Sequence, residues 1–134
     1  MKLIINTDGG ARGNPGPAGI GVVIRDENNH VIAEHKNYIG ETTNNVAEYK
    51  ALILALQEAE KLGAEQLVVN MDSELVVRQM QGKYKIKEPT LQVLAQEVIK
   101  LIHGFKYVAF QHVMREQNKE ADKLVNQAID LALV

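Results

Sequence analysis

The chain has 134 residues, of which 46% are hydrophobic and 24% charged, and it carries a formal net charge of −2. This composition excludes a fibrous or largely disordered chain, and the absence of cysteine excludes disulfides and thiolate-bound metals. Because no apolar run approaches the roughly 20 residues of a spanning helix and no signal peptide is evident, we expect a cytoplasmic protein without a membrane partner.

The first third of the chain predicts three consecutive strands joined by turns. Their β-type runs are Lys2–Thr7, Gly19–Arg25 and Val31–Tyr38. The segment Gly9–Gly19 is rich in glycine and proline, so it predicts an ordered, turn-rich loop between the first two strands. The Asn28-Asn29 pair suits a hairpin turn between the second strand and the third.

The rest of the chain predicts four helices and two further strands. The helices are expected from Thr42 or Thr43 to near Gly63, at Ser73–Gln81, from a cap at Thr90 to Ile102, and from about Asn118 onward with Ala121, Val125, Ala128 and Ala132 inward. The strands are expected at Leu67–Met71, buried on both faces, and at Tyr107–Val113. The order β-β-β-α-β-α-α-β-α implies one α/β domain over residues 1–134, with a mixed sheet and helices on its faces.

Two aspartates, Asp8 and Asp72, each follow an apolar strand directly. If those strands are parallel neighbours, both carboxylates emerge at one edge of the sheet, where α/β folds tend to place ligands. Aspartates also end strands because they favour turns, and either residue taken alone fits that structural role better.

Glu48 is more informative because it shares the apolar stripe of its helix with Leu52 and Leu56. A buried carboxylate is rare unless it is paired or binds a metal, although a boundary residue with a bent side chain also fits the pattern. Asp122 lies in the first turn of the last helix, where the helix dipole alone favours a carboxylate. Taken together with Asp8 and Asp72, these residues form a plausible oxygen cage for magnesium or manganese rather than zinc.

Four blocks, in matching order and spacing, resemble the type 1 ribonuclease H family. They are Thr7-Asp8-Gly9-Gly10 with Gly13–Gly19, then Thr43–Tyr49, Met71-Asp72-Ser73 and Asn118–Leu124. The resemblance spans essentially the whole chain. Many members carry a long, basic, tryptophan-containing handle after the fourth-strand motif, whereas Gly82–Pro89 is short and the chain has no tryptophan. The chain therefore looks more like the archaeal-type and plant-type branch.

The resemblance implies a five-stranded mixed sheet with helices on both faces, and a metal site made of Asp8, Glu48, Asp72 and Asp122. It implies two magnesium ions, with manganese as an alternative, acting together in phosphodiester hydrolysis. The implied activity is that of an endonuclease that cuts the RNA strand of an RNA–DNA hybrid and leaves 5′-phosphate and 3′-hydroxyl ends. By position, His112 takes the role of the family's mobile histidine, with Arg115 in the same loop.

The same resemblance implies that the RNA is read through its 2′-hydroxyls in the minor groove. The implied contacts are the backbone of Gly9 and Gly10, Glu48, and the side chains of Asn14, Asn44 and Asn45, with Thr43 left for a phosphate of the DNA strand. From the residues alone, helix capping explains Asn44 and Asn45 equally well, and a lone histidine at a strand end is more often structural.

Two other functions fit parts of the sequence. A catalytically silent hybrid-binding module would normally have lost a carboxylate, and all four are present here. Recombinases and transposases of the same fold lack the turn Gly13-Asn14-Pro15-Gly16. The net charge of −2 argues mildly against a nucleic-acid partner, unless part of the acidic count belongs to a metal site. We expect the enzyme to act as a monomer.

Overall fold

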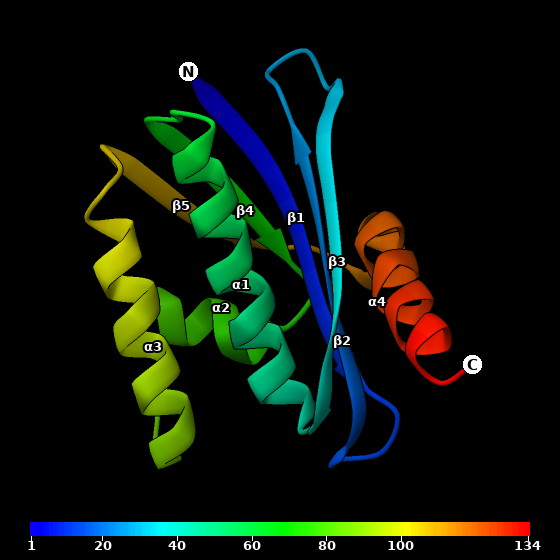
Figure 1. The fold of residues 1–134 in the computed structure, drawn as a ribbon. Helices are drawn as coiled ribbons and strands as arrows, with labels where there is room; N and C mark the ends of the chain where they lie inside the picture. The colour runs from blue at the N-terminus through cyan, green and yellow to red at the C-terminus, as the bar shows by residue number, and fades with distance from the viewer.

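The computed structural model describes all residues, 1–134, as one mixed sheet between layers of helices (Figure 1). The strands are β1 (Lys2–Ala11), β2 (Gly16–Arg25), β3 (Val31–Thr42), β4 (Gln66–Met71) and β5 (Tyr107–His112). The helices are α1 (Asn44–Lys61), α2 (Glu74–Met80), α3 (Pro89–Ile102) and α4 (Lys119–Ala132), with a 3₁₀ turn at Arg115–Gln117. The predicted α/β class, five-stranded mixed sheet and order of elements are confirmed.

The order of strands in the sheet is β3-β2-β1-β4-β5. The first three strands pair in antiparallel fashion, whereas β1, β4 and β5 run parallel. Thr7 of β1 lies opposite Met71 of β4, so Asp8 and Asp72 follow at the same level. The condition set by the sequence, that these two strands be parallel neighbours, is therefore met.

The main core lies between α1 and one face of the sheet. Leu52, Ala55, Leu56 and Ala59 of the predicted stripe have no exposed surface, and they pack with Leu3, Ile5, Val22, Ile24, Leu67 and Val69. Each fully buried Val, Leu or Ile side chain contributes about 1.5–3 kcal/mol, so this face anchors α1 firmly on the strands. α3 packs beside α1 on the same side (Figure 1). None of the helices has the length and apolar character that a membrane crossing would need.

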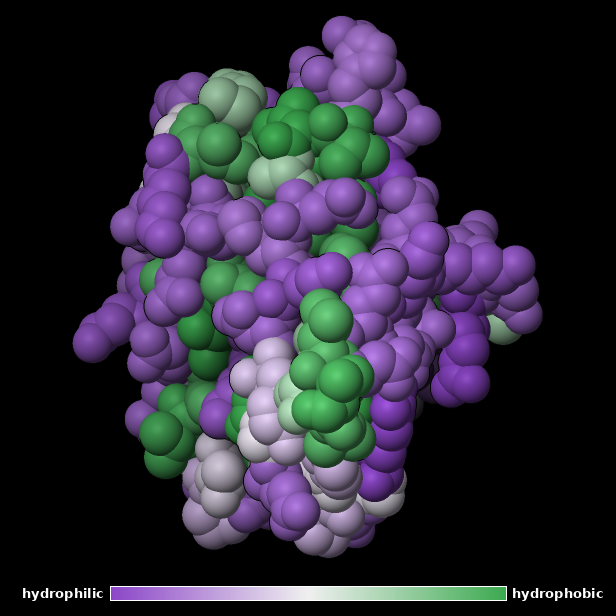
Figure 2. Space-filling model, turned by 45° about the vertical axis from the view of Figure 1, so that its right-hand side comes forward, coloured by the Kyte–Doolittle hydropathy of each residue, from purple (hydrophilic) through white to green (hydrophobic).

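Helix α4 covers the opposite face, but only over β1, β2 and β3. Close approach depends on Gly21, where a Cβ atom would lie 2.4 Å from the Ala121 carbonyl oxygen. Because α4 does not reach β4, Val68 and Asn70 are only half-buried, and the prediction that β4 is buried on both faces was wrong. The outer surface on this side is mostly hydrophilic, with separate hydrophobic patches (Figure 2).

The inward face of α4 also differs from the prediction at one end. Ala121, Val125 and Ala128 are buried as expected, together with Leu124 and Ile129. Ala132 is exposed, because it lies in the last turn of the helix, beside the C-terminus of the chain. The stripe therefore extends less far along the helix than the alanine spacing indicated.

The glycine-rich segment is mostly strand and not loop, which corrects the prediction for Gly9–Gly19. β1 continues to Ala11 and β2 begins at Gly16, so only a short turn separates them. Gly9 lies within β1, and its missing side chain lets α1 approach the strand closely. A Cβ atom there would lie 2.3 Å from the backbone carbonyl of Ala47. The hydrogen bonds of the β1–β2 ladder continue through this segment.

Of the two helix caps that the sequence predicted, the one at Thr42 or Thr43 is confirmed at Thr43 and the one at Thr90 is not. The Thr43 hydroxyl accepts a hydrogen bond from Val46 N at the start of α1, and Ser73 caps α2 in the same way. The predicted cap at Thr90 was wrong, since the Glu88 carboxylate accepts from the backbone of Thr90. Pro89 then occupies the first helical position, which suits its fixed φ and missing N–H.

Candidate active site

Three carboxylates meet where β1, α1 and the end of β4 come together. One oxygen each of Asp8, Glu48 and Asp72 lies within 4.8 Å of the others. Asp8 is 7% exposed and Glu48 is 5% exposed, whereas Asp72 is half-buried. Glu48 points toward the sheet, as its place on the apolar stripe predicted, and its Oε1 accepts a hydrogen bond from Gly9 N.

These carboxylates line a cavity of about 380 Å³ that has no hydrophobic residue in its wall. The wall consists of Asp8, Gly9, Gly10, Asn44, Asn45, Glu48, Asp72, Ser73, Arg115 and Asp122. Asp122 reaches the cavity from the first turn of α4. Its side chain is exposed, and it does not belong to the group of three carboxylates that lie within 4.8 Å of one another. All four acidic residues singled out from the sequence therefore face one cavity.

The electrostatics of the cluster disfavour three negative charges without a compensating cation. Burial, followed by the charges of Glu48 and Asp72, raises the pKa of Asp8 above its ordinary value. Burial also raises the pKa of Glu48, although the hydrogen bond from Gly9 N opposes that shift. The hydrogen bond between the two carboxyls favours the proton on Asp8. A divalent cation would displace that proton, because metal binding to such a site is coupled to deprotonation.

The donor set decides which cation suits the site. The side-chain atoms in the wall that could bind a cation are carboxylate, amide and hydroxyl oxygens, with no histidine and no sulfur ligand among them. Hard cations such as Mg²⁺ and Mn²⁺ prefer such oxygens, whereas zinc sites in proteins are usually built with histidine or cysteine. The residues therefore fit a hard divalent cation.

The predicted substrate-binding residues divide between two neighbouring cavities. Gly9, Gly10, Asn44 and Asn45 line the acidic one. Asn14 and Thr43 instead line a second cavity of about 470 Å³, and Asn45 borders both. Their contact with a substrate remains a prediction.

The two asparagines Asn14 and Asn44 join the β1–β2 turn to the start of α1. The Asn14 Oδ1 accepts a hydrogen bond from Asn44 N at 3.0 Å, and the Asn44 Oδ1 accepts from Ala11 N at 2.8 Å. Helix capping, the structural alternative for Asn44, is carried instead by Thr43. The side chain of Asn44 therefore fixes the end of β1 rather than its own helix.

The structure does not bring His112 into the cavity. His112 ends β5 opposite Met71 of β4, and partners in a parallel ladder point to the same face of the sheet. Met71 is buried in the core under α1, so His112 is half-buried on that side. Arg115, from the 3₁₀ turn, lines the cavity instead. Sequence reasoning gave no role to Ser73, although the Met71-Asp72-Ser73 block contains it.

Comparison with known proteins places the chain in a family. A family model described as reverse transcriptase-like matches residues 6–128. A bifunctional protein of Mycobacterium tuberculosis is 48% identical over 133 residues, which cover 98% of this chain and 36% of that protein. Ribonuclease HI of Halobacterium salinarum is 40% identical over 123 residues, covering 92% of this chain and 62% of the relative. The chain thus spans about a third of the mycobacterial protein's length.

Among solved structures, LC11-RNase H1 in complex with an RNA/DNA hybrid superposes with a TM-score of 0.95. The two chains are 54% identical, and the match covers 98% of this chain and 99% of that one. Fold and acidic cavity thus define an α/β protein of the ribonuclease H-like class. The chain belongs to the reverse transcriptase-like family, and within it to the type 1 ribonucleases H, as its four sequence blocks predicted.

Proposed function

We propose that the protein is an endoribonuclease that hydrolyses the RNA strand of RNA–DNA hybrids, with residues 1–134 acting as one catalytic domain. The observation that carries this proposal is the cavity in which Asp8, Glu48, Asp72 and Asp122 converge without any apolar wall. The similarity to a ribonuclease H1 that was solved with an RNA/DNA hybrid supports the choice of substrate. The expected products carry 5′-phosphate and 3′-hydroxyl ends.

We propose two Mg²⁺ ions as cofactors, with Mn²⁺ as an alternative. Asp8, which is adjacent to both Glu48 and Asp72, would contact both ions. Asp72 and Asp122 would hold one ion and Glu48 the other. When bound, such a pair activates a water molecule for attack on phosphorus and stabilises the leaving oxygen.

The neutral polar residues of the two cavities are suited to binding the sugar-phosphate backbone. Asn44 and Asn45 present amide groups beside the carboxylates, next to the backbone of Gly9 and Gly10. We propose that these groups contact the 2′-hydroxyls of the RNA strand, which DNA lacks. Thr43, in the adjacent cavity with Asn45, is the proposed contact for a phosphate of the other strand.

Strand choice tests this function directly. With Mg²⁺ present, a labelled RNA–DNA hybrid should be cut only in its RNA strand, and all-DNA duplex should stay intact. Replacing the RNA sugars at the cut site by 2′-deoxy or 2′-O-methyl sugars should stop cleavage, because the proposed contacts need the free hydroxyl. Gel electrophoresis of end-labelled strands measures both effects. Hybrid bound but left uncut with Mg²⁺ or Mn²⁺ would favour the silent binding module.

Arg115 is the only cationic residue in the wall of the acidic cavity, and its guanidinium takes part in none of the protein's ion pairs. We propose that it binds a phosphate oxygen of the substrate. Arg115→Ala should then lower kcat/KM for hybrid by about 10- to 100-fold, since charge-assisted hydrogen bonds contribute roughly 1.5–3 kcal/mol. Arg115→Lys should recover part of the loss. If His112→Ala reduces turnover more than Arg115→Ala does, the assignment of Arg115 is wrong.

A further inference from the structure

Asn118 lies where β1, the end of β4 and the start of α4 meet, and only 1% of its surface is exposed. Its Nδ2 donates to the carbonyl oxygen of Thr7 at 2.8 Å and faces Oδ2 of Asp72 at 3.4 Å. Its backbone carbonyl accepts from Asp122 N at 3.1 Å. One residue thus contacts the neighbour of Asp8, the side chain of Asp72 and the backbone of Asp122.

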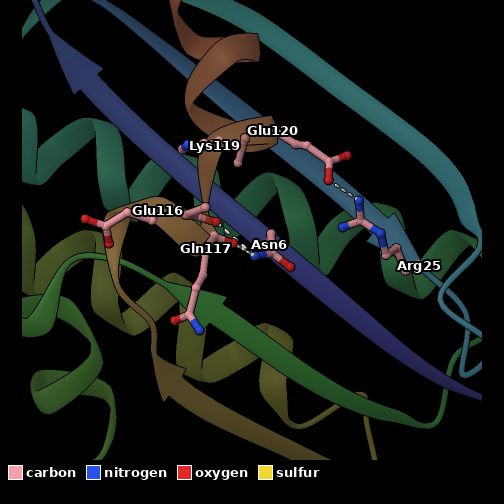
Figure 3. Close-up of a pocket in the computed structure, with 8 residues that line it drawn as sticks. Asn6, Arg25, Glu116, Gln117, Lys119 and Glu120 are labelled. Atoms are coloured by element: carbon pink, nitrogen blue, oxygen red, sulfur yellow. Dashed lines mark hydrogen bonds and ion pairs between the residues drawn. The ribbon is translucent and has the colours of Figure 1, made fainter.

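The orientation of the Asn118 amide is fixed by groups that cannot exchange roles. The Thr7 carbonyl can only accept, so the amide nitrogen must face it. The Oδ1 atom then accepts from Asn6 Nδ2 at 3.0 Å. The same Asn6 nitrogen lies 3.4 Å from the carbonyl oxygen of Gln117, which also can only accept (Figure 3). Both amides are therefore held in one arrangement.

The position of Asn118 in the chain suggests a different role, that of a helix cap. Asparagine before a first helical turn usually accepts a backbone hydrogen bond there, which stabilises the helix by about 1 kcal/mol. The Asn118 side chain forms no such bond with α4 and points to the sheet instead. Because this residue forgoes its local role for contacts at the carboxylates, helix stability does not explain its placement.

We propose that Asn118 is a positioning residue for the acidic cluster. Its amide holds the end of β1 against Asp72, engages one oxygen of the Asp72 carboxylate and leaves the other free, and its carbonyl begins the turn that carries Asp122. One buried residue thus links three of the four carboxylates, with its side chain placing the end of β1 and Asp72 and its backbone placing Asp122. The proposal rests on the proposed function only in taking the cluster to bind a divalent cation.

The test measures cation binding apart from cleavage. In Asn118→Ala, isothermal titration with Mg²⁺ and with Mn²⁺, without nucleic acid, should show affinity weaker by about 10- to 100-fold, the usual effect of removing a group that orients metal ligands. In the cleavage assay, kcat should fall at low Mg²⁺ and recover as Mg²⁺ is raised, while the KM for hybrid stays near the wild-type value. Unchanged cation affinity in folded Asn118→Ala would overturn the proposal.

A second variant and a control separate positioning from loss of stability. Asn6→Ala removes the contact that orients the Asn118 amide, and it should weaken Mg²⁺ binding several-fold. Leu124→Ala removes packing of α4 against Val23, at a cost of about 2–3 kcal/mol, without touching a carboxylate. If Leu124→Ala weakens Mg²⁺ binding as much as Asn118→Ala, the role is only structural.

If Asn118→Ala does not fold, Asn6→Ala still tests the positioning role of Asn118, because wild-type Mg²⁺ affinity in Asn6→Ala would then overturn that role.

The titrations contain no substrate, so they also keep the positioning role of Asn118 apart from the proposed activity. A wild-type protein that binds Mg²⁺ but leaves hybrid uncut would refute the proposed activity. The comparison of Mg²⁺ affinities among the variants would remain a test of Asn118.

Discussion

Asp8→Asn is expected to abolish hybrid cleavage, lowering turnover by about 10³-fold or more while the fold survives. Asp8 lies next to both Glu48 and Asp72, so it is the carboxylate best placed to share two cations. An amide is neutral and carries a donor group, so it is a poor replacement for a carboxylate ligand of Mg²⁺. Initial rates on labelled hybrid at saturating Mg²⁺ measure the effect. Near-normal turnover would contradict the proposed metal site.

The same substitution should stabilise the protein when no divalent cation is bound. A more stable variant without activity would show that the loss of activity does not come from unfolding. Burial and the nearby charges of Glu48 and Asp72 raise the pKa of Asp8, so the folded state keeps a proton that the unfolded state releases above roughly pH 4. The free energy of unfolding of the wild type therefore falls as pH rises from that value toward the raised pKa. Asp8→Asn removes this loss.

Denaturant unfolding in the presence of a chelator, at pH 5 and at pH 8, measures that stability difference. The gain from Asp8→Asn over the wild type should be larger at pH 8 than at pH 5. The wild type loses stability as the pH rises from about 4 toward the raised pKa of Asp8, and pH 8 lies further along that range. A variant less stable than the wild type at both values would mean that the carboxyl of Asp8 is not destabilising in the folded state. It would also remove the physical reason for expecting a cation there.

The sequence predicted the elements of the site that depend on local periodicity. Glu48 was found because a helical stripe must face the core, and the structure places it 5% exposed among buried residues. Asp8 and Asp72 were found because each ends an apolar strand, and only the parallel pairing of β1 with β4 remained to be established. These features follow from patterns within about ten residues, which a single sequence displays directly.

Features that depend on contacts between distant segments were not predicted. Gly9 was assigned to a loop because glycine is common in turns, whereas in the structure it lies in β1 at the contact with α1. Its backbone N–H donates to Glu48, which is 39 residues away in the sequence. Arg115 was placed only in the same loop as His112, yet Arg115 lines the cavity, whereas His112 lies beside Met71 at the end of β5. The sequence marked Asn118 only as the start of the last helix and of the fourth block, and its bonds to Thr7 and Asp72 appear only in three dimensions.

Gly9→Ala is expected to damage both the fold and the site, although it adds a single methyl group. The new Cβ atom would lie 2.3 Å from the carbonyl carbon and oxygen of Ala47 and 2.5 Å from Glu48 N. These are backbone atoms, so no side-chain rotation relieves the clash, and α1 must retreat by about 1 Å to reach ordinary contact distance. We expect a loss of about 3 kcal/mol in the free energy of unfolding. Thermal and denaturant unfolding measure that loss.

The neighbouring glycine provides a matched control for stability. A Cβ atom at Gly10 would lie 3.6 Å from a Val125 methyl group, which is an ordinary contact, so Gly10→Ala should change the free energy of unfolding by less than about 1 kcal/mol. In Gly9→Ala, the retreat of α1 also moves Glu48 away from Gly9 N and from Asp8. Because a displacement of about 1 Å can cost 10²-fold in rate, turnover should fall by roughly that factor even where the variant remains folded. Equal stability of the two variants would mean that α1 does not pack on β1 at Gly9.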